Sequence, residues 1–213
     1  MKKLFAILLA LAMLLSLAAC DTGGGSGDSK PTVDGTWKGT IDFAPSMEVS
    51  LKAEAAIDDS MPTEIEVPLT IDFICVFSAD GTYTVEADEE SIDAFFDAMA
   101  GVMIDVMYAP RVDLDALLAE EGMTMEEFKE QVREDMESPY AAEAFDIKGF
   151  YKYEGGKLYT AEYKADLDAG EYYEISTVTL SSTKLTITDI EQDGVKMSEI
   201  VPDMLPIVFT RQK

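Results

Sequence analysis

The chain has 213 residues, of which 42 are acidic and 16 basic, and its formal net charge is -26. This length fits one domain, or one domain with an insertion, together with a targeting segment. Because 47% of the residues are apolar, the chain can bury a core and is not a disordered acidic polymer. The charge argues against nucleic acids and anionic membrane surfaces as partners. Histidine is absent, which removes the commonest general base and transition-metal ligand.

The N-terminus has the pattern of a signal peptide. Lys2 and Lys3 precede an uncharged apolar run from Leu4 to Ala19, which is short for a membrane-spanning helix of roughly 20 residues. The run ends in Leu17-Ala18-Ala19-Cys20, which resembles the lipobox of bacterial lipoproteins. The resemblance implies that residues 1–19 are removed and that Cys20 carries a diacylglycerol group. The alternatives are an ordinary secretory signal with an incidental cysteine and an uncleaved membrane anchor.

The lipoprotein resemblance predicts a location on the extracytoplasmic face of the cell membrane. Two or three acyl chains anchor a soluble domain stably, and residues 20–32 are rich in Gly and Ser, as expected of a flexible linker. Removal of residues 1–19 takes away two basic residues and no acidic ones, which leaves 14 and 42 and a net charge of -28. We expect no cofactor beyond this covalent lipid, no nucleic-acid partner and a monomeric state.

Residues 33–88 predict strands. Alternation from Gly35 to Phe43 places Trp37, Ile41 and Phe43 on one face. A second strand region runs from 65 to 77, is interrupted by Pro68, and contains Cys75, which we expect to be a buried, unreactive thiol. The sequence 79–81 (Ala-Asp-Gly) predicts a hairpin turn that leads into a strand over 82–87. The pattern of residues 44–64 is ambiguous, and residues 47–55 are interpretable as a strand.

Residues 89–147 predict a helical insertion of about three helices. The first stops before Pro110, the second ends at Gly122, and the third begins at Thr124 with a capping box to Glu127 and runs to about residue 137. We expect the apolar stripe of the first helix to pack on the β-domain or on the other helices, and its aspartates to face water. The stripe comprises Phe95, Phe96, Met99, Val102, Met103 and Val106, and the aspartates are Asp93, Asp97 and Asp105.

Residues 148–213 predict strands again, at 150–154, 157–160, 171–180, 183–190 and 207–211. If Gly155-Gly156 is a two-residue turn, Tyr151 and Tyr153 share a face with Leu158; a three-residue loop would reverse this face. The fold class is therefore mainly β with a helical insertion (α+β). It consists of one domain over 33–213, with about eight strands in a β-barrel or sandwich and the insertion at 89–147.

The motif Gly35-x-Trp37 resembles the signature that opens the barrel of lipocalins. The resemblance implies an antiparallel β-barrel in which a basic residue of the last strand, here Arg211, packs across Trp37. The sequence departs from the family in lacking its Thr-Asp-Tyr pattern and in the position of its helices.

Three interpretations of function follow. The main one is a non-enzymatic binding module whose barrel holds a small amphipathic ligand, with Tyr83, Tyr151, Tyr153 and Leu158 as candidate wall residues. In the alternative the barrel is filled by side chains, as many large aromatics favour, and its outside binds an envelope protein or the cell wall. A carboxylate-based hydrolase is the third, and we expect no enzyme because no nucleophile has an evident activator.

The strongest metal candidate is a loop that resembles the start of a calcium site, with Asp189, Glu191 and Asp193 followed by Gly194. Position twelve of that loop is Ile200 instead of an acid, so we interpret the segment as a turn between strands and expect no metal site.

Overall fold

The computed structural model describes residues 31–56, 62–108, 112–136 and 145–213. The predicted signal peptide, Cys20 and nearly all of the predicted linker lie outside the described residues. Among the helices of the described segments, none has the length and apolar character needed to cross a membrane.

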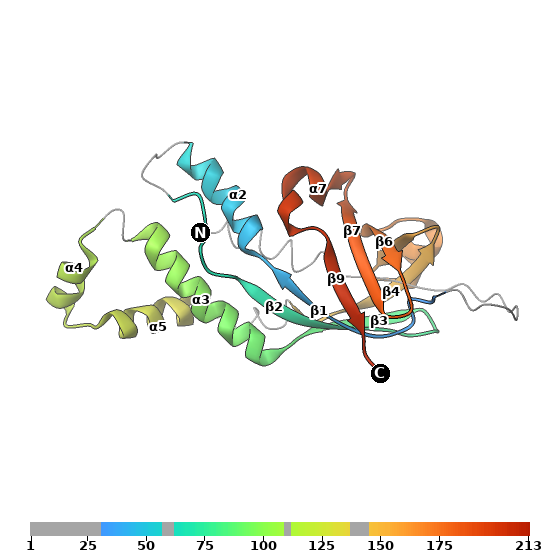
Figure 1. Cartoon of the computed structure of the whole chain (residues 1–213), viewed down its shortest axis with the longest axis horizontal. Coiled ribbons are helices and arrows are strands. Elements are labelled where there is room, and N and C mark those ends of the chain that lie inside the picture. The colour runs from blue at the N-terminus through green and yellow to red at the C-terminus, as the bar shows by residue number, and fades with distance from the viewer. Residues whose placement is uncertain (1–30, 57–61, 109–111, 137–144) are drawn as a thin grey trace, which may run out of the picture.

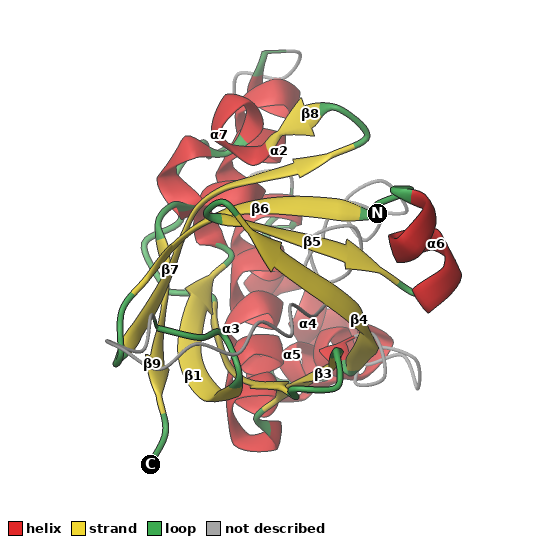
Figure 2. Cartoon of the chain, turned by 90° about the vertical axis from the view of Figure 1, so that its right-hand side faces the viewer, coloured by secondary structure: helices red, strands yellow, loops and turns green. Residues whose placement is uncertain are grey.

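The described residues form nine strands, and eight of them close into an antiparallel barrel. Each barrel strand pairs with the next in sequence, and β9 returns to pair with β1 and so closes the ring, while β8 only extends β7 as a hairpin. Figure 2 shows this ring of strands from the side opposite the long helices. The strands are β1 (Gly35–Asp42), β2 (Thr70–Phe77), β3 (Thr82–Ala87), β4 (Ile147–Glu154), β5 (Lys157–Ala161), β6 (Glu174–Leu180), β7 (Lys184–Gln192), β8 (Val195–Lys196) and β9 (Ile207–Arg211). The predicted β-barrel of about eight strands is therefore confirmed.

The described helices all lie in alternate connections of the barrel. They are α2 (Ala44–Ala55), α3 (Glu89–Met107), α4 (Leu114–Glu121), α5 (Met125–Met136), α6 (Lys164–Ala169), α7 (Met197–Ile200) and the 3₁₀ helix η2 (Pro202–Met204). They join β1 to β2, β3 to β4, β5 to β6, and β7 by way of β8 to β9. Because consecutive connections of an up-and-down barrel alternate between its two ends, these four connections leave the same end, and the short turns lie at the other. Figure 1 shows α2, α3, α4 and α5 gathered beyond that end.

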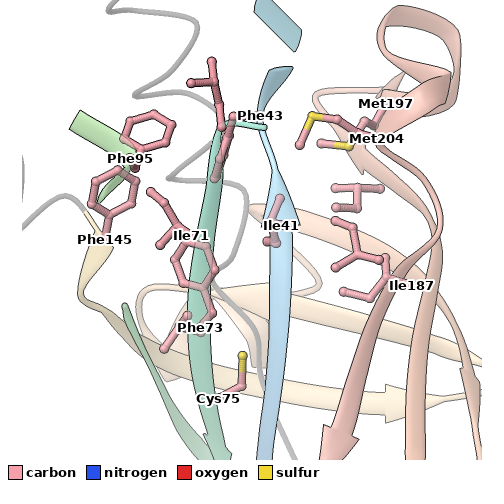
Figure 3. Packing of buried hydrophobic residues seen from close by; sticks show 14 of the residues in the cluster. Ile41, Phe43, Ile71, Phe73, Cys75, Phe95, Phe145, Ile187, Met197 and Met204 are labelled. Atoms are coloured by element: carbon pink, nitrogen blue, oxygen red, sulfur yellow. The ribbon is translucent and has the colours of Figure 1, made fainter. Parts of the chain in front are cut away.

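The helical insertion packs as predicted. The apolar stripe of α3 is buried, from Phe95 at 2% exposure to Met103 at 9%. The Phe95 ring meets the Phe43 ring edge-on, with centroids 5.7 Å apart (Figure 3). The three aspartates of α3 face water. Two of them form ion pairs with α5, Asp93 with Arg133 at 2.9 Å and Asp97 with Lys129 at 2.8 Å.

The caps of the insertion also agree with the sequence. The Glu127 backbone N–H donates to Thr124 Oγ1 (3.2 Å), and the Thr124 N–H donates to the Glu127 carboxylate (2.7 Å). This reciprocal pair is the predicted capping box, and it satisfies backbone donors that the helix itself leaves free. Gly122 ends α4 in the left-handed region, at φ +69°.

The interpretation of residues 47–55 as a strand is wrong, since these residues belong to α2. Pro45 lies in the first turn of α2, where its missing N–H costs nothing. Ala44, Met47 and Leu51 recur at helical spacing on the buried side. The helices α6 and α7 were not predicted either, because helices of six and four residues are too short to show a period. The strand expected from residue 171 begins at 174.

Candidate functional site

At the end of the barrel with the short turns, Arg211 lies over the indole of Trp37, with Cζ 4.3 Å from the ring centroid. The two residues are also direct partners in the β1–β9 ladder. Trp37 is fully buried, and its Nε1–H donates to the Val33 carbonyl at 2.6 Å. A guanidinium over an indole contributes roughly 0.5–2 kcal/mol. The pair thus fastens the first barrel strand to the last.

The spacing of Gly35 and Trp37 has a steric reason. Gly35 has φ +125°, and a Cβ at this position would lie 2.7 Å from Arg211 Nη1. The same Nη1 donates to the Asp34 carbonyl at 2.6 Å. Glycine therefore leaves the space through which the guanidinium reaches both the backbone and the tryptophan. The contact between Arg211 and Trp37 thus has a structural role, because it joins β9 to β1 where the barrel closes.

The candidate wall residues point mostly into the barrel. Glu154 pairs with Lys157, so Gly155-Gly156 is a two-residue turn, and Tyr151 and Leu158 are buried on the inner face. Tyr153 is half-buried. Phe77 lies beside Tyr151, with centroids 4.8 Å apart, and stacks on Tyr83 at 6.4 Å.

The Tyr151 hydroxyl, at the edge of this aromatic group, lies 2.9 Å from Asp34 Oδ1 and donates to it. Gly149 makes room for Tyr83, since a Cβ there would lie 2.9 Å from the Tyr83 ring. The structure thus brings Tyr83, Tyr151 and Leu158 to the interior, where they pack against other side chains.

The interior also holds a buried carboxyl group that sequence reasoning missed. Glu174 is 1% exposed, and it pairs across the ladder with Thr160. The Ser176 hydroxyl donates to Glu174 Oε1 at 2.7 Å, and the Thr160 hydroxyl donates to the Glu174 backbone carbonyl at 3.1 Å. Among the described residues, nothing forms a hydrogen bond with the buried Oε2. We call Thr160, Glu174 and Ser176 the interior polar cluster.

Burial raises the pKa of Glu174 well above its usual range, and the hydrogen bond from Ser176 opposes this shift. Removal from water disfavours the charged form of a carboxyl group, so burial favours the neutral form of Glu174. A neutral acid has one O–H donor to offer, which an ionised carboxylate lacks.

The signal that could have revealed Glu174 lies within its own strand. Glu174 and Ser176 share their side of β6 with the buried Val178, whereas the apolar Ile175 points the other way and is half-buried. A period-two reading that started from Val178 would have placed the acid inside.

A second concave feature, which we call the α6 groove, lies outside the barrel between α6, β4 and the β2–β3 turn. It encloses about 400 Å³. Leu167 anchors α6 on its buried side, and Gly170 ends the helix at φ +79°. Figure 2 shows α6 standing against the flank of the barrel. The lining residues are Gly81, Phe150, Lys152, Lys164, Leu167, Asp168, Ala169, Gly170 and Tyr172.

The candidate metal loop is a hairpin. Gln192 pairs with Val195, so Asp193 and Gly194 form a two-residue turn, with φ +51° and +78°. Asp189 accepts hydrogen bonds from the Ser198 N–H (3.1 Å) and hydroxyl (3.0 Å), which fixes the start of α7. No group of three acidic or cysteine side chains able to hold a metal ion occurs within the described segments. The arrangement thus makes Asp189 a local cap, and it does not bring Asp189, Glu191 and Asp193 together as ligands.

Cys75 is buried on the inner face of β2, as predicted, with 2% exposure. Burial strongly raises the pKa of its thiol, so the nucleophilic thiolate is not formed at neutral pH.

The described residues thus define an eight-stranded antiparallel barrel with helical connections, an interior polar cluster and an outer groove. Comparison with known proteins gave no matching family model, curated protein or solved structure.

Proposed function

We propose that this chain is a lipid-anchored, extracytoplasmic binding module that holds its target on the outside of a filled β-barrel. The lipobox-like residues Leu17–Cys20 support the anchor, and the absence of histidine from the sequence and the burial of Cys75 support a non-enzymatic role.

The observation that carries this proposal is the occupation of the barrel interior. Six large aromatic side chains from β1, β2, β3, β4 and β9 are each at most 3% exposed, and they are Trp37, Phe73, Phe77, Tyr83, Tyr151 and Phe209. The interior of an eight-stranded barrel is just wide enough to be filled by side chains. Rings of this size therefore occupy the space that a ligand would need.

One observation favours a second candidate, in which a small amphipathic ligand enters the barrel. Glu174 is buried, and its Oε2 has no hydrogen-bond partner among the residues that the structure describes. Leaving such a group without a partner costs about 1–3 kcal/mol. A ligand with a polar end could accept a hydrogen bond from the neutral acid while its apolar part lies among the aromatics.

The two candidates are separated by titrating the protein with N-phenyl-1-naphthylamine, an uncharged apolar fluorophore. A filled barrel gives no saturable one-to-one binding. The proposal would be overturned by saturable binding that is blocked in Leu158→Trp and weakened in Glu174→Gln. The first of these variants adds volume at a fully buried inner position. Such binding would place the site inside the barrel.

The anchor is tested by Cys20→Ala. We expect the substitution to leave the precursor unprocessed or to release the protein from the membrane fraction, because the acyl chains have no other attachment site in the lipobox. A variant that still matures and sediments with membranes would contradict the lipoprotein assignment.

A further inference from the structure

The α6 groove lies on the outer face of the β4–β5 hairpin, where the side chains alternate with the buried inner ones. Lys152 and Tyr159 are direct partners across this hairpin, and Lys152 Nζ lies 5.6 Å from the Tyr159 ring centroid. Tyr172 packs on Tyr159, with centroids 4.7 Å apart. Tyr172, which lines the groove, is thus held against a second aromatic ring of the β4–β5 hairpin. Its volume of about 400 Å³ falls in the range of pockets for small ligands.

The lining is amphipathic. Phe150, Leu167 and Tyr172 provide apolar surface, while Lys152, Lys164 and Asp168 bring donors and an acceptor to the same space. Tyrosine also combines an apolar ring with a polar hydroxyl. A ligand that fits this lining must itself present an apolar face and hydroxyl-type groups that both donate and accept.

The charges of the groove are balanced, in contrast to the rest of this acidic molecule. Lys164 Nζ lies 3.3 Å from Asp168 Oδ1, and Lys152 Nζ lies 2.5 Å from Glu154 Oε2. Each ammonium group already has a carboxylate, so an anionic ligand would find no unpaired cation and would meet the net negative charge of the chain. A cationic ligand would be attracted more strongly to the rest of the molecule, where acidic residues far outnumber basic ones. The groove therefore favours an uncharged ligand.

We propose that the α6 groove binds a neutral carbohydrate, with one sugar ring stacked on Tyr172 and its hydroxyls bonded to Asp168 and Lys164. The C–H face of a pyranose supplies the apolar surface, and its hydroxyls donate and accept at once. Hydrogen bonds to charged groups are stronger than those between neutral groups. Sugar hydroxyls that bridge the Lys164–Asp168 ion pair would form bonds of this stronger kind. This inference rests on the proposed function, in which the target binds outside the barrel, and it names the class of target.

The test is a titration of the full chain with neutral tetrasaccharides, in which binding is measured by calorimetry and by saturation-transfer NMR. The probes are tetra-N-acetylchitotetraose, maltotetraose and cellotetraose, and the charged comparators are tetragalacturonate and de-acetylated chitotetraose. The lipid-anchored chain is kept in solution by a detergent with a polyoxyethylene head group, because a sugar-based detergent would compete for the groove. We expect at least one neutral probe to bind, with saturation transfer strongest at its ring C–H protons.

Matched variants locate the binding. Tyr172→Ala should weaken the affinity about tenfold, Tyr172→Phe should weaken it less because the ring remains, and Lys164→Gln with Asp168→Asn should weaken it about threefold to tenfold. Tyr163→Ala is the control, because Tyr163 is 59% exposed and does not line the groove. Lys184→Gln, at an exposed lysine of β7, is the control for loss of charge.

Three results would overturn the carbohydrate assignment: no neutral probe binds at millimolar concentration, Tyr172→Ala and Tyr163→Ala bind equally, or a charged comparator binds more tightly than its neutral counterpart. These results leave the proposed function standing as long as N-phenyl-1-naphthylamine does not enter the barrel. Saturable entry of that fluorophore defeats the proposed function itself, whichever sugar binds.

Discussion

Replacement of Glu174 by glutamine should change how the stability of the barrel depends on pH. The folded-state pKa of Glu174 is raised above its ordinary value of 4.5 by burial. Such a group contributes stability that is fully present below the unfolded pKa and is lost as the pH rises through the folded pKa. The glutamine side chain has nearly the same shape and no charge, so it removes this loss.

The magnitude follows from linkage. Between pH 4.5 and the folded pKa, the free energy of unfolding of the wild type should fall, relative to Glu174→Gln, by about 1.4 kcal/mol for each pH unit. The other carboxyl groups titrate in both proteins and cancel in the difference. Any cost of the unpaired amide, about 1–3 kcal/mol, shifts the whole difference without changing its slope.

The assay is urea unfolding at half-unit steps from pH 4.5 to 8, followed by the fluorescence of Trp37, which is the single tryptophan and is fully buried. Glu171→Gln, at an exposed position three residues earlier, is the control for the chemical change from acid to amide. A Glu174→Gln difference that stays constant over this range would refute the reasoning, because Glu174 would then be ionised in the folded barrel like an exposed acid.

Three further predictions concern the core and the closure of the barrel. Arg211→Ala should lower the free energy of unfolding in urea by about 2–3 kcal/mol, since it removes the contact with Trp37 and two hydrogen bonds to backbone carbonyls. Arg211→Lys should lower it less, and equal losses would show that the fork-shaped guanidinium is unimportant. Phe95→Ala should destabilise the domain by about 3–5 kcal/mol, and a loss under 1 kcal/mol would mean that α3 does not pack on the barrel in solution. In a Cys20→Ala background, Cys75 should react with an aromatic disulfide reagent only in denaturant, and rapid labelling of the native chain would contradict its burial.

Much of the fold is readable from local patterns. Alternation placed Trp37 and Ile41 on the inner face of the first strand, and the spacing of apolar residues gave α3 and its buried stripe. A two-residue turn fixes the register of its hairpin, so Gly155-Gly156 was enough to assign Tyr151 and Leu158 to one face once its length was chosen. In each case the interaction that decides the structure lies within a few residues along the chain.

The interior polar cluster and the α6 groove depend instead on closure of the sheet. Ile175 is more apolar than Glu174 or Ser176, yet it lies outside, because pairing with both β5 and β7 fixes which side of β6 faces the interior. In a closed barrel the register of the neighbouring strands determines burial, even where one strand's own pattern favours the other face.

The sequence by itself determined the fold class, the helical insertion and the lipobox-like N-terminus, since period, capping and turn chemistry are local. Only the tertiary structure decided that residues 44–55 form a helix, that an acid lies in the core, and that Phe150, Lys164 and Tyr172 from separate elements line one groove. Such juxtapositions come from the closure of the ring and the packing of α6 against it, and no spacing along the chain encodes them directly.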